Sequence, residues 1–288
     1  MSSLTRPATA DELAWITAPA LRSHVVDSPG ELLSLSESEP WRVRVTERGE
    51  AVIVGRWREH LDDCAIFGLW CSPRRVPVIV TDLLEVARDE GFRRLVGPLA
   101  PEREARHYLD AGLRVAERVV VMRARPGEVG TGAGASEGPP CGLSLREASP
   151  RDVDAILALD AACFMPFWRY DRPSLARLLD TERVVLAQFD GRTVGYTLST
   201  MRAGEGSLGR LAVAPARRRR GVGRFLAVEA CTWLAAGGAR NVVLSTQDDN
   251  TASRSLYARI GFRETGDVLV SCASGTLPGR DRGRGMVS

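Results

Sequence analysis

Four consecutive arginines, Arg217–Arg220, stand directly before Gly221, Val222 and Gly223, and an apolar segment follows. Guanidinium groups bind phosphate oxygens through charge-assisted hydrogen bonds, and glycines let a phosphate come close to the backbone. The first N–H groups of a helix have no partner inside the helix, and they attract anions. A helix that begins at Gly221 would therefore complete a binding site for a pyrophosphate.

The arginine run could instead bind nucleic acid. The formal net charge of the 288-residue chain is only +3, whereas dedicated nucleic-acid-binding domains usually carry a larger positive excess. We therefore expect one phosphorylated small molecule at this loop, and a nucleic acid is the alternative.

Other kinds of catalytic chemistry have few candidate side chains. Apart from histidine, all 39 basic residues are arginines, so no lysine nucleophile is present. His24, His60 and His107 all lie in the first half. The second half therefore lacks the residues for Ser-His or Cys-His catalysis and for a histidine-based metal site, and we expect no metal.

The six cysteines include no CxxC pair, which favours buried, reduced thiols in a cytoplasmic protein. Met1–Leu13 is polar, and no apolar run approaches the ~18 residues that a membrane helix needs. We therefore expect neither an export signal nor a membrane partner.

The elements that position the arginine-rich loop follow from hydrophobic spacing. Residues 183–201 alternate around a DGR turn and predict a β-hairpin. Residues 207–213 predict a further strand, which Pro215 ends. Apolar residues then recur at helical spacing from Gly221 to the glycine pair at 237–238, so the loop lies between a strand and a helix.

The flanks of this core predict further strands and helices. Residues 143–147 predict a short strand, and Ser149 precedes a proline at the start of a helix. Residues 241–245 predict a strand, and Asn250 can cap the helix that follows it. A strand at 267–271 closes a mixed α/β domain.

The first half repeats the later part of this pattern. The segment AIFGLWCSP matches LGRLAVAP, and YLDAGL at Tyr108–Leu113 matches YARIGF at Tyr257–Phe262. We interpret the match as an internal duplication with a repeat of about 145 residues. Two unrelated α/β units are the alternative.

Composition marks the boundaries between these parts. Pro126–Gly142 is rich in glycine, proline and serine and predicts a flexible linker, and Ser274–Ser288 predicts a disordered tail. The expected domains are therefore residues 1–125 and 143–273.

The pattern Arg218-x-x-Gly221-x-Gly223, placed after a strand and a proline, resembles the acetyl-CoA signature of the GNAT (Gcn5-related) N-acetyltransferase superfamily. The resemblance covers Leu143–Ser271 and includes NTASRSLYARIGF after the loop. It implies an α/β fold of two tandem GNAT-like domains. Each would be a mixed, mostly antiparallel sheet flanked by helices, with a splayed parallel strand pair at its centre.

The resemblance also implies which residues bind acetyl-CoA, the co-substrate. The backbone of the strand before the loop would pair with the pantetheine arm, and one of its N–H groups could stabilise the oxyanion. The loop, the helix start and one asparagine would complete the binding site. The expected coenzyme-binding residues are Leu211, Ala212, Val213, Arg218, Arg219, Arg220, Gly221, Val222, Gly223, Arg224 and Asn250.

Tyr257 matches the position at which many GNAT enzymes place the general acid that protonates the leaving thiolate. The alternative is that Tyr257 packs on the apolar face of its helix. The general base stays open among Glu205, Asp248 and Asp249, and each of these can equally be a solvated loop residue.

Aromatic residues between the first two helices of the second domain would line the acceptor side. Phe164, Phe167, Trp168 and Tyr170 could form a wall for the substrate or could fill the space between the two halves. The acceptor is expected to be a primary amine on a small molecule or peptide. Its identity is open, as is the choice between a monomer, with two halves as a pseudo-dimer, and a homodimer.

The first half resembles a GNAT copy whose coenzyme loop has been lost. Its loop, SPRRVPVIVTDLL, has no glycine, is about five residues shorter, and places Pro77 where N–H donors are needed. We therefore expect one active site, in the second domain, that acetylates an amine by direct attack on the thioester. The alternative is a non-catalytic module that senses acyl-CoA or binds nucleic acid.

Overall fold

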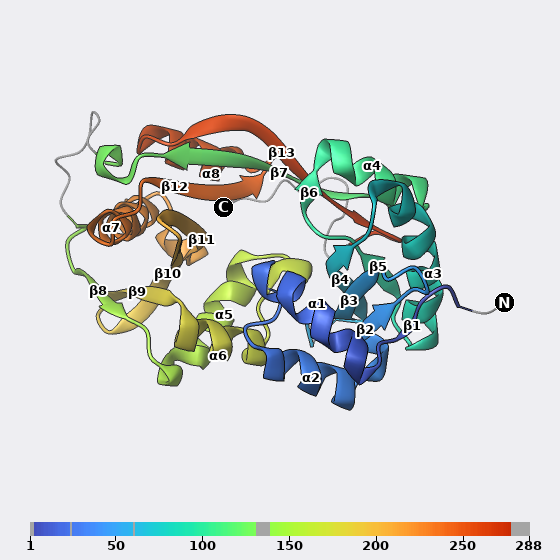
Figure 1. The fold of residues 1–288 in the computed structure, drawn as a ribbon. Coiled ribbons are helices and arrows are strands. Elements are labelled where there is room, and N and C mark those ends of the chain that lie inside the picture. The colour runs from blue at the N-terminus through green and yellow to red at the C-terminus, as the bar shows by residue number, and fades with distance from the viewer. Residues whose placement is uncertain (1–2, 24, 60, 131–138, 278–288) are drawn as a thin grey trace. The chain divides into compact units, whose positions relative to one another are not determined.

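The computed structural model describes residues 3–23, 25–59, 61–130 and 139–277. These residues divide into two compact units, one of residues 3–118 with 269–277 and the other of residues 119–268. Figure 1 labels the helices and strands of both units.

The first unit is built on a mostly antiparallel sheet in the order β1-β2-β3-β4-β5-β13, in which only β4 and β5 pair in parallel. Two helices at its start, α1 and α2, were not foreseen from the sequence. Its elements are β1 (Arg6–Pro7), α1 (Ala10–Arg22), α2 (Pro29–Ser38), β2 (Val43–Val45), β3 (Ala51–Arg56), β4 (Asp63–Trp70), α3 (Val76–Asp89), β5 (Arg94–Val96), β6 (Ala100–Pro101) and α4 (Glu102–Asp110).

The second unit has the sheet order β7-β12-β11-β10-β9-β8, in which only β11 and β12 pair in parallel. The hairpin of β9 and β10, the strand before Pro215 and the helix after Gly221 all form as predicted. Its elements are β8 (Leu143–Glu147), α5 (Val153–Cys163), α6 (Arg172–Thr181), β9 (Arg183–Phe189), β10 (Arg192–Arg202), β11 (Glu205–Val213), α7 (Val222–Ala236), β12 (Asn241–Gln247) and α8 (Thr251–Arg259).

Two long strands contribute to both units. The strand β7 (Arg114–Ala124) begins in the first unit, and its residues 119–124 pair antiparallel with β12 in the second. The strand β13 (Arg263–Ala273) begins in the second unit, and its residues 269–273 pair with β5 and β6 in the first. Each unit therefore contains a strand segment from the other half of the sequence.

The sequence ranges that predicted the linker and the tail lie partly outside the described residues, namely at 131–138 and 278–288. Within the described part, Pro126–Glu128 form a turn, and Val129 is buried among core residues of the second unit. Leu277 is also buried, at 3% exposure. The domain boundaries at residues 125 and 143 stay a prediction.

A β-bulge interrupts β11 in the second unit. Arg210 lies opposite Leu198 of β10 and Leu208 lies opposite Ser199, so Gly209 is the extra residue. A side chain at Gly209 would point at Leu198, which packs in the cluster that contains α5 and α6. Because a bulge shifts the alternation of side chains by one position, Arg210 faces the same side as Gly209.

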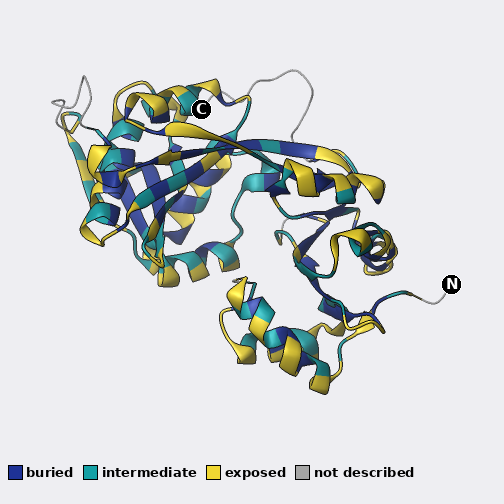
Figure 2. Cartoon of the chain, turned by 45° about the horizontal axis from the view of Figure 1, so that its top comes forward, coloured by how far each residue is buried: buried dark blue, intermediate teal, exposed yellow. Residues whose placement is uncertain are grey.

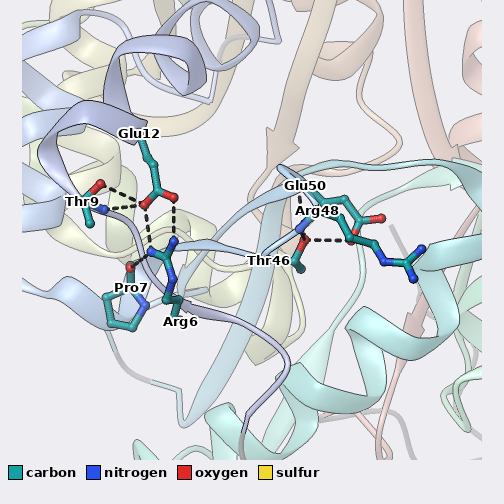
Figure 3. Close-up of polar contacts among 7 residues, drawn as sticks. All are labelled: Arg6, Pro7, Thr9, Glu12, Thr46, Arg48 and Glu50. Atoms are coloured by element: carbon teal, nitrogen blue, oxygen red, sulfur yellow. Dashed lines mark hydrogen bonds and ion pairs between the residues drawn. The ribbon is translucent and has the colours of Figure 1, made fainter.

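Polar contacts fix the start of the first unit, as Figure 3 shows. Arg6 forms an ion pair with Glu12 at 2.7 Å, and Glu12 accepts the backbone N–H of Thr9, which caps α1. In the turn before β3, the Thr46 hydroxyl donates to Glu50 at 2.9 Å. The carboxylate of Glu50 thereby lies at the end of the β2–β3 hairpin.

Each unit has its own apolar core, and in Figure 2 most buried residues lie on the strands, while exposed residues lie on the helices, on loops and at one end of β13. In the second unit, Leu226, Ala230 and Leu234 of α7 are fully buried, as their helical spacing predicted. Gly195 of β10 allows the close approach of α7, since an added Cβ would lie 2.9 Å from Leu226 Cδ1. Side-chain burial of this kind is the main driving force for the fold.

The assignment of the end of β13 to the first unit is testable with one residue pair. Val270 is 1% exposed, whereas Val268 on the same strand is only half-buried. We expect Val270→Ala to lower the free energy of unfolding by about 2 kcal/mol through the cavity it leaves, and Val268→Ala by less than ~1 kcal/mol. Urea denaturation measures both, and hydrogen exchange at β5 should rise only in Val270→Ala. Unchanged exchange at β5 would contradict the assignment.

Candidate active site

The parallel strands β11 and β12 separate near their middles. They pair at only three positions, Glu205–Ser207 with Asn241–Val243. Beyond these, β11 continues beside β10 as far as Val213, and β12 continues beside β7 as far as Gln247. Within the described residues, no strand pairs with β11 on its other edge beyond Ser207. This open edge includes the segment 211–213 that was predicted to hold the pantetheine arm.

The arginine-rich loop joins the end of β11 to α7. Pro215–Arg217 form a 3₁₀ turn, and α7 starts after Gly221. Gly221 is the N-cap residue of α7, and because it has no side chain it cannot cap the first helical N–H groups. Arg219 has φ +60° and Gly221 has φ +79°. Left-handed residues next to a helix start turn successive N–H groups toward one concave point, which suits an anion.

The four arginines of the run have different surroundings. The Arg217 guanidinium lies over the ring of Phe189 at 4.7 Å. Arg218 folds back, and its Nε donates to the carbonyl oxygen of Val213 at 3.1 Å. The remaining two, 219–220, are exposed on the loop. Two of the four thus contact neighbouring groups of the second unit, and two are exposed to solvent.

The end of β11 is also held by a thiol. Cys163, at the end of α5, donates its Sγ–H to the same Val213 carbonyl at 3.3 Å. Burial raises the pKa of this thiol, so it stays a neutral donor. A pantetheine arm on this edge must therefore pair with other backbone groups of residues 211–213, or displace these two donors from Val213.

The first turn of α7 lies close to β11 and α8. An added Cβ at Gly223 would lie 3.4 Å from Leu256 Cδ2 and 3.5 Å from Val213 Cγ2. Val222 is buried at 1% exposure, and Arg224 is half-buried. The loop, the end of β11 and the start of α7 are thus gathered around one point.

Asn250 and Tyr257 lie at the two ends of α8. The Asn250 side chain accepts the N–H of Ser253 at 3.1 Å and caps the helix, as predicted. Tyr257 is 7% exposed, and its ring packs edge-on against Phe262 at 5.8 Å. Within the described part of the chain its hydroxyl has no hydrogen-bond partner, and burial raises the pKa of the phenol well above its usual value. The ring is therefore a core residue, whether or not the hydroxyl also acts as an acid.

The three candidate bases lie at opposite ends of the strand pair β11 and β12. Glu205 accepts Asn241 Nδ2 at 3.2 Å, at the end where β11 and β12 still pair. It therefore lies at the opposite end of β11 from residues 211–213, so it is not retained as a candidate base. Asp248 and Asp249 follow the last residue of β12, at the end where the strands have separated. These two aspartates remain the candidates.

The aromatic segment between α5 and α6 is anchored by its rings. Phe167 is fully buried at 1% exposure, and it packs edge-on against Trp168 at 4.9 Å. Trp168 and Tyr170 are half-buried. Phe167 thus packs in the interior and contacts Trp168, while Trp168 and Tyr170 keep partly accessible surfaces.

A buried ionic cluster, which the sequence did not lead us to expect, lies beside this segment. Arg210 Nη2 lies 2.7 Å from Asp160 Oδ1, with side-chain exposures of 10% and 1%. The Tyr196 hydroxyl donates to the same oxygen at 2.5 Å. One signal was present: Asp160 falls at helical spacing from Ile156, on the buried face of α5, where a charge requires a partner.

Neither a metal site nor a membrane helix is found in the parts of the chain that the structure describes. Those residues include no group of three or more His, Cys, Asp or Glu side chains placed to bind a metal ion. No described helix is both long and apolar enough to span a bilayer.

Residues 153–262, from the start of α5 to the start of β13, match the family described as "Acetyltransferase (GNAT) family". The chain carries a GNAT acetyltransferase domain. The match contains the open edge of β11, the arginine-rich loop and α8, so the expected family resemblance is confirmed for the second half.

Curated relatives support the same family. The chain is 32% identical to a mycothiol acetyltransferase from Clavibacter michiganensis over 163 residues, which are 53% of each protein. It is 42% identical to a mycothiol acetyltransferase from Nocardia farcinica over 100 residues, which are 33% of this chain and 32% of the relative. Each match thus spans about half of the relative's length or less.

Solved structures extend the GNAT fold to the whole chain. A tandem GNAT protein from the clavulanic acid biosynthesis pathway is similar with a TM-score of 0.60, 16% identity and 82% coverage of both chains. A GCN5-related N-acetyltransferase from Sphaerobacter thermophilus gives a TM-score of 0.58 at 18% identity, over 95% of this chain and 96% of that one. The predicted fold of two tandem GNAT-like domains is confirmed.

The two loop glycines should respond differently to the same substitution. Gly221→Ala places a side chain at φ +79°, and we expect it to cost about 1 kcal/mol of unfolding free energy. Gly223 lies inside the first turn with ordinary contacts, so Gly223→Ala should be neutral or stabilise by up to ~1 kcal/mol. Chemical denaturation of both variants measures the difference, and equal effects would contradict the loop geometry.

Proposed function

We propose that this protein is an acetyl-CoA-dependent N-acetyltransferase that acetylates a primary amine at the second unit. The observation that carries the proposal is the start of α7, which lies beside the open edge of β11 and follows exposed arginines at 219–220. This arrangement occurs inside the segment that matches the GNAT family.

The chain's own groups fit the two ends of the coenzyme. The N–H groups at the start of α7, with Arg219, Arg220 and Arg224, would bind the pyrophosphate. The backbone of residues 211–213 would pair with the pantetheine arm, with Arg218 holding the end of that strand. Gly223 leaves room for this approach, because its position carries no side chain between the loop and α8. Asn250 would lie near the coenzyme as the cap of α8.

The chemical step needs an open path for the amine and a proton for the leaving group. The amine nitrogen attacks the thioester carbonyl, and a backbone N–H of β11 would stabilise the oxyanion. The C–S bond then breaks as the amide forms, and Tyr257 would donate its phenolic proton to the thiolate. The amine's own proton leaves through water or through Asp248 or Asp249 and restores the phenol. No covalent bond to the protein forms.

The acceptor side would be formed by Trp168 and Tyr170, with Phe167 beneath them. Curated relatives that share part of this chain are named mycothiol acetyltransferases. The first amine to test is therefore mycothiol without its acetyl group. All six cysteines are free thiols, which is consistent with work in the cytoplasm.

We also propose that the first unit binds no coenzyme. Its Arg75 forms an ion pair with Glu50 at 2.9 Å, so its guanidinium is already neutralised by a carboxylate. The helix α3 follows the Pro73–Arg75 turn directly and has Pro77 in its first turn, which removes an N–H donor. The expected stoichiometry is one coenzyme per chain.

Calorimetry with acetyl-CoA tests the binding site. We expect wild-type protein to bind one acetyl-CoA, and Gly221→Asp to weaken binding by at least ~100-fold, because it adds a negative side chain at the phosphate site. Gly191→Asp is the matched control: Gly191 also has a left-handed φ, of +72°, but lies in the β9–β10 turn. Its affinity should be unchanged.

Two other results would overturn the proposal. If the wild-type protein does not bind acetyl-CoA, acetyl-CoA is not its co-substrate. A polyanion bound more tightly than acetyl-CoA, with an affinity that falls steeply between low and moderate salt, would make the loop a nucleic-acid surface.

Kinetics of Tyr257→Phe test the general acid. We expect kcat for amine acetylation to fall by about 100-fold, while the variant stays folded because the hydroxyl has no hydrogen-bond partner in the described chain. Tyr108→Phe, in the matching position of the first unit, should leave kcat unchanged. An unchanged kcat in Tyr257→Phe would leave the ring as a packing residue only.

The raised pKa of Tyr257 also determines how the stability of the folded protein changes with pH. Because burial disfavours the phenolate, the folded protein is stabilised by the neutral ring below the ordinary phenol pKa of about 10. That contribution is lost as the pH rises further through the folded-state pKa. The activity of the wild type should therefore show no loss from Tyr257 ionisation below pH ~10.

A further inference from the structure

Arg210 is a buried cation that neither the coenzyme nor the chemical step requires. It follows the bulge in β11, and its side chain is 10% exposed. Its Nε and Nη2 donate to Asp160 Oδ1 at 3.0 and 2.7 Å. Nη2 also donates to the backbone carbonyl of Trp168 at 2.6 Å. One guanidinium group therefore connects β11, α5 and the aromatic segment.

The carboxylate of Asp160 extends the same connection. Its Oδ2 accepts the backbone N–H of Tyr170 at 2.9 Å, and its Oδ1 accepts the Tyr196 hydroxyl. The segment between α5 and α6 is thus held through its backbone at two positions, Trp168 and Tyr170, by one pair of opposite charges.

Two rings of the segment pack on the same cation. The Phe164 ring centre lies 3.6 Å from the Arg210 Cζ atom, and the Tyr170 ring centre lies 4.4 Å from it. A desolvated cation is attracted to an aromatic face by the quadrupole of the ring. The planar guanidinium can accept such stacking and keep its in-plane hydrogen bonds at the same time.

Stability alone gives a weak reason for this cluster. A buried ion pair costs desolvation energy that often equals its Coulombic gain, so apolar residues of similar volume would stabilise the core as well. In the matching strand of the first unit, β4, Gly68 corresponds to Arg210 and Trp70 corresponds to Ala212. The Trp70 ring packs against the Gly68 backbone. On that side the described residues of the first unit form an apolar cluster that includes Ile53 and Trp70.

We propose that Arg210 is a positioning residue that fixes the segment Phe164–Tyr170, and with it the amine-acceptor side of the site. The proposal rests on the proposed function for the role of that segment as the acceptor side. Arg210 touches neither reactant. It acts by holding Trp168 and Tyr170 through their backbones, so their half-buried side chains have one arrangement beside β11.

The test compares Arg210→Lys with Arg183→Lys in the full-length protein. Lysine keeps the charge beside Asp160 but cannot form the planar fork to Asp160 and Trp168 together. Arg183 is the matched control: it bonds Glu229 and Glu147 and lies 4.9 Å from the Trp233 ring, away from the segment. Arg210→Met is less suitable, because it leaves Asp160 charged and unpaired in the core.

Hydrogen exchange at the amides of residues 164–170 is the first readout. We expect exchange there to rise about tenfold or more in Arg210→Lys and to stay at the wild-type rate in Arg183→Lys, with the rest of the second unit unchanged in both. Acetyl-CoA affinity should stay within about twofold of the wild type. For an amine that the wild type acetylates, KM for the amine should rise at least ~10-fold, with KM for acetyl-CoA unchanged.

The outcomes separate this proposal from the proposed function. If exchange at 164–170 stays at the wild-type rate in Arg210→Lys, or rises equally in Arg183→Lys, Arg210 has no positioning role. If exchange rises throughout the second unit, Arg210 contributes only to stability. If the wild type does not bind acetyl-CoA, the proposed function fails, while the exchange result still decides what Arg210 positions.

Discussion

The separation of β11 from β12 is the constraint on which the rest of the candidate site depends. The two strands pair at only three positions, so within the described residues no strand pairs with the edge of β11 that lies beyond Ser207. Buried backbone groups need partners. At Val213 two side chains supply them, Cys163 and Arg218, and Arg218 thereby also fixes the loop that leads into α7. An open strand edge and an uncapped helix start are placed together by a single gap in the sheet.

The bulge at Gly209 in β11 is a second backbone feature on which the arrangement of the site depends. Without the bulge at Gly209, strand alternation would direct Arg210 toward α7, into an apolar core. With the bulge, Arg210 faces α5, where Asp160 neutralises it. The same cation then orders the segment that follows α5, through the Trp168 carbonyl. The bulge therefore determines both where the charge is buried and which side chains lie beside the open edge.

Local patterns predicted most of the second unit, because they depend on neighbours in sequence. The β9–β10 hairpin, the α7 face and the Asn250 cap are all of this kind. The exchange of β7 and β13 was not predictable, since both read as ordinary strands and their partners lie far away in the sequence. The Asp160–Arg210 pair was missed for a similar reason: its residues lie 50 positions apart, so the charge of Asp160 on the buried face of α5 did not identify its partner.

The two units show which parts of this design the fold itself requires. The first unit also pairs its central strands, β4 and β5, at three positions only, and it has a bulge in the corresponding strand, at Phe67. Both features belong to the backbone, and many different side chains are compatible with them. The proposed coenzyme loop would need a left-handed position and helix-start N–H donors. Gly221 provides the left-handed position, whereas Pro77 removes one N–H donor from the start of α3. Both units therefore keep separating central strands, whereas the proposed coenzyme site depends on a few loop residues of the second unit.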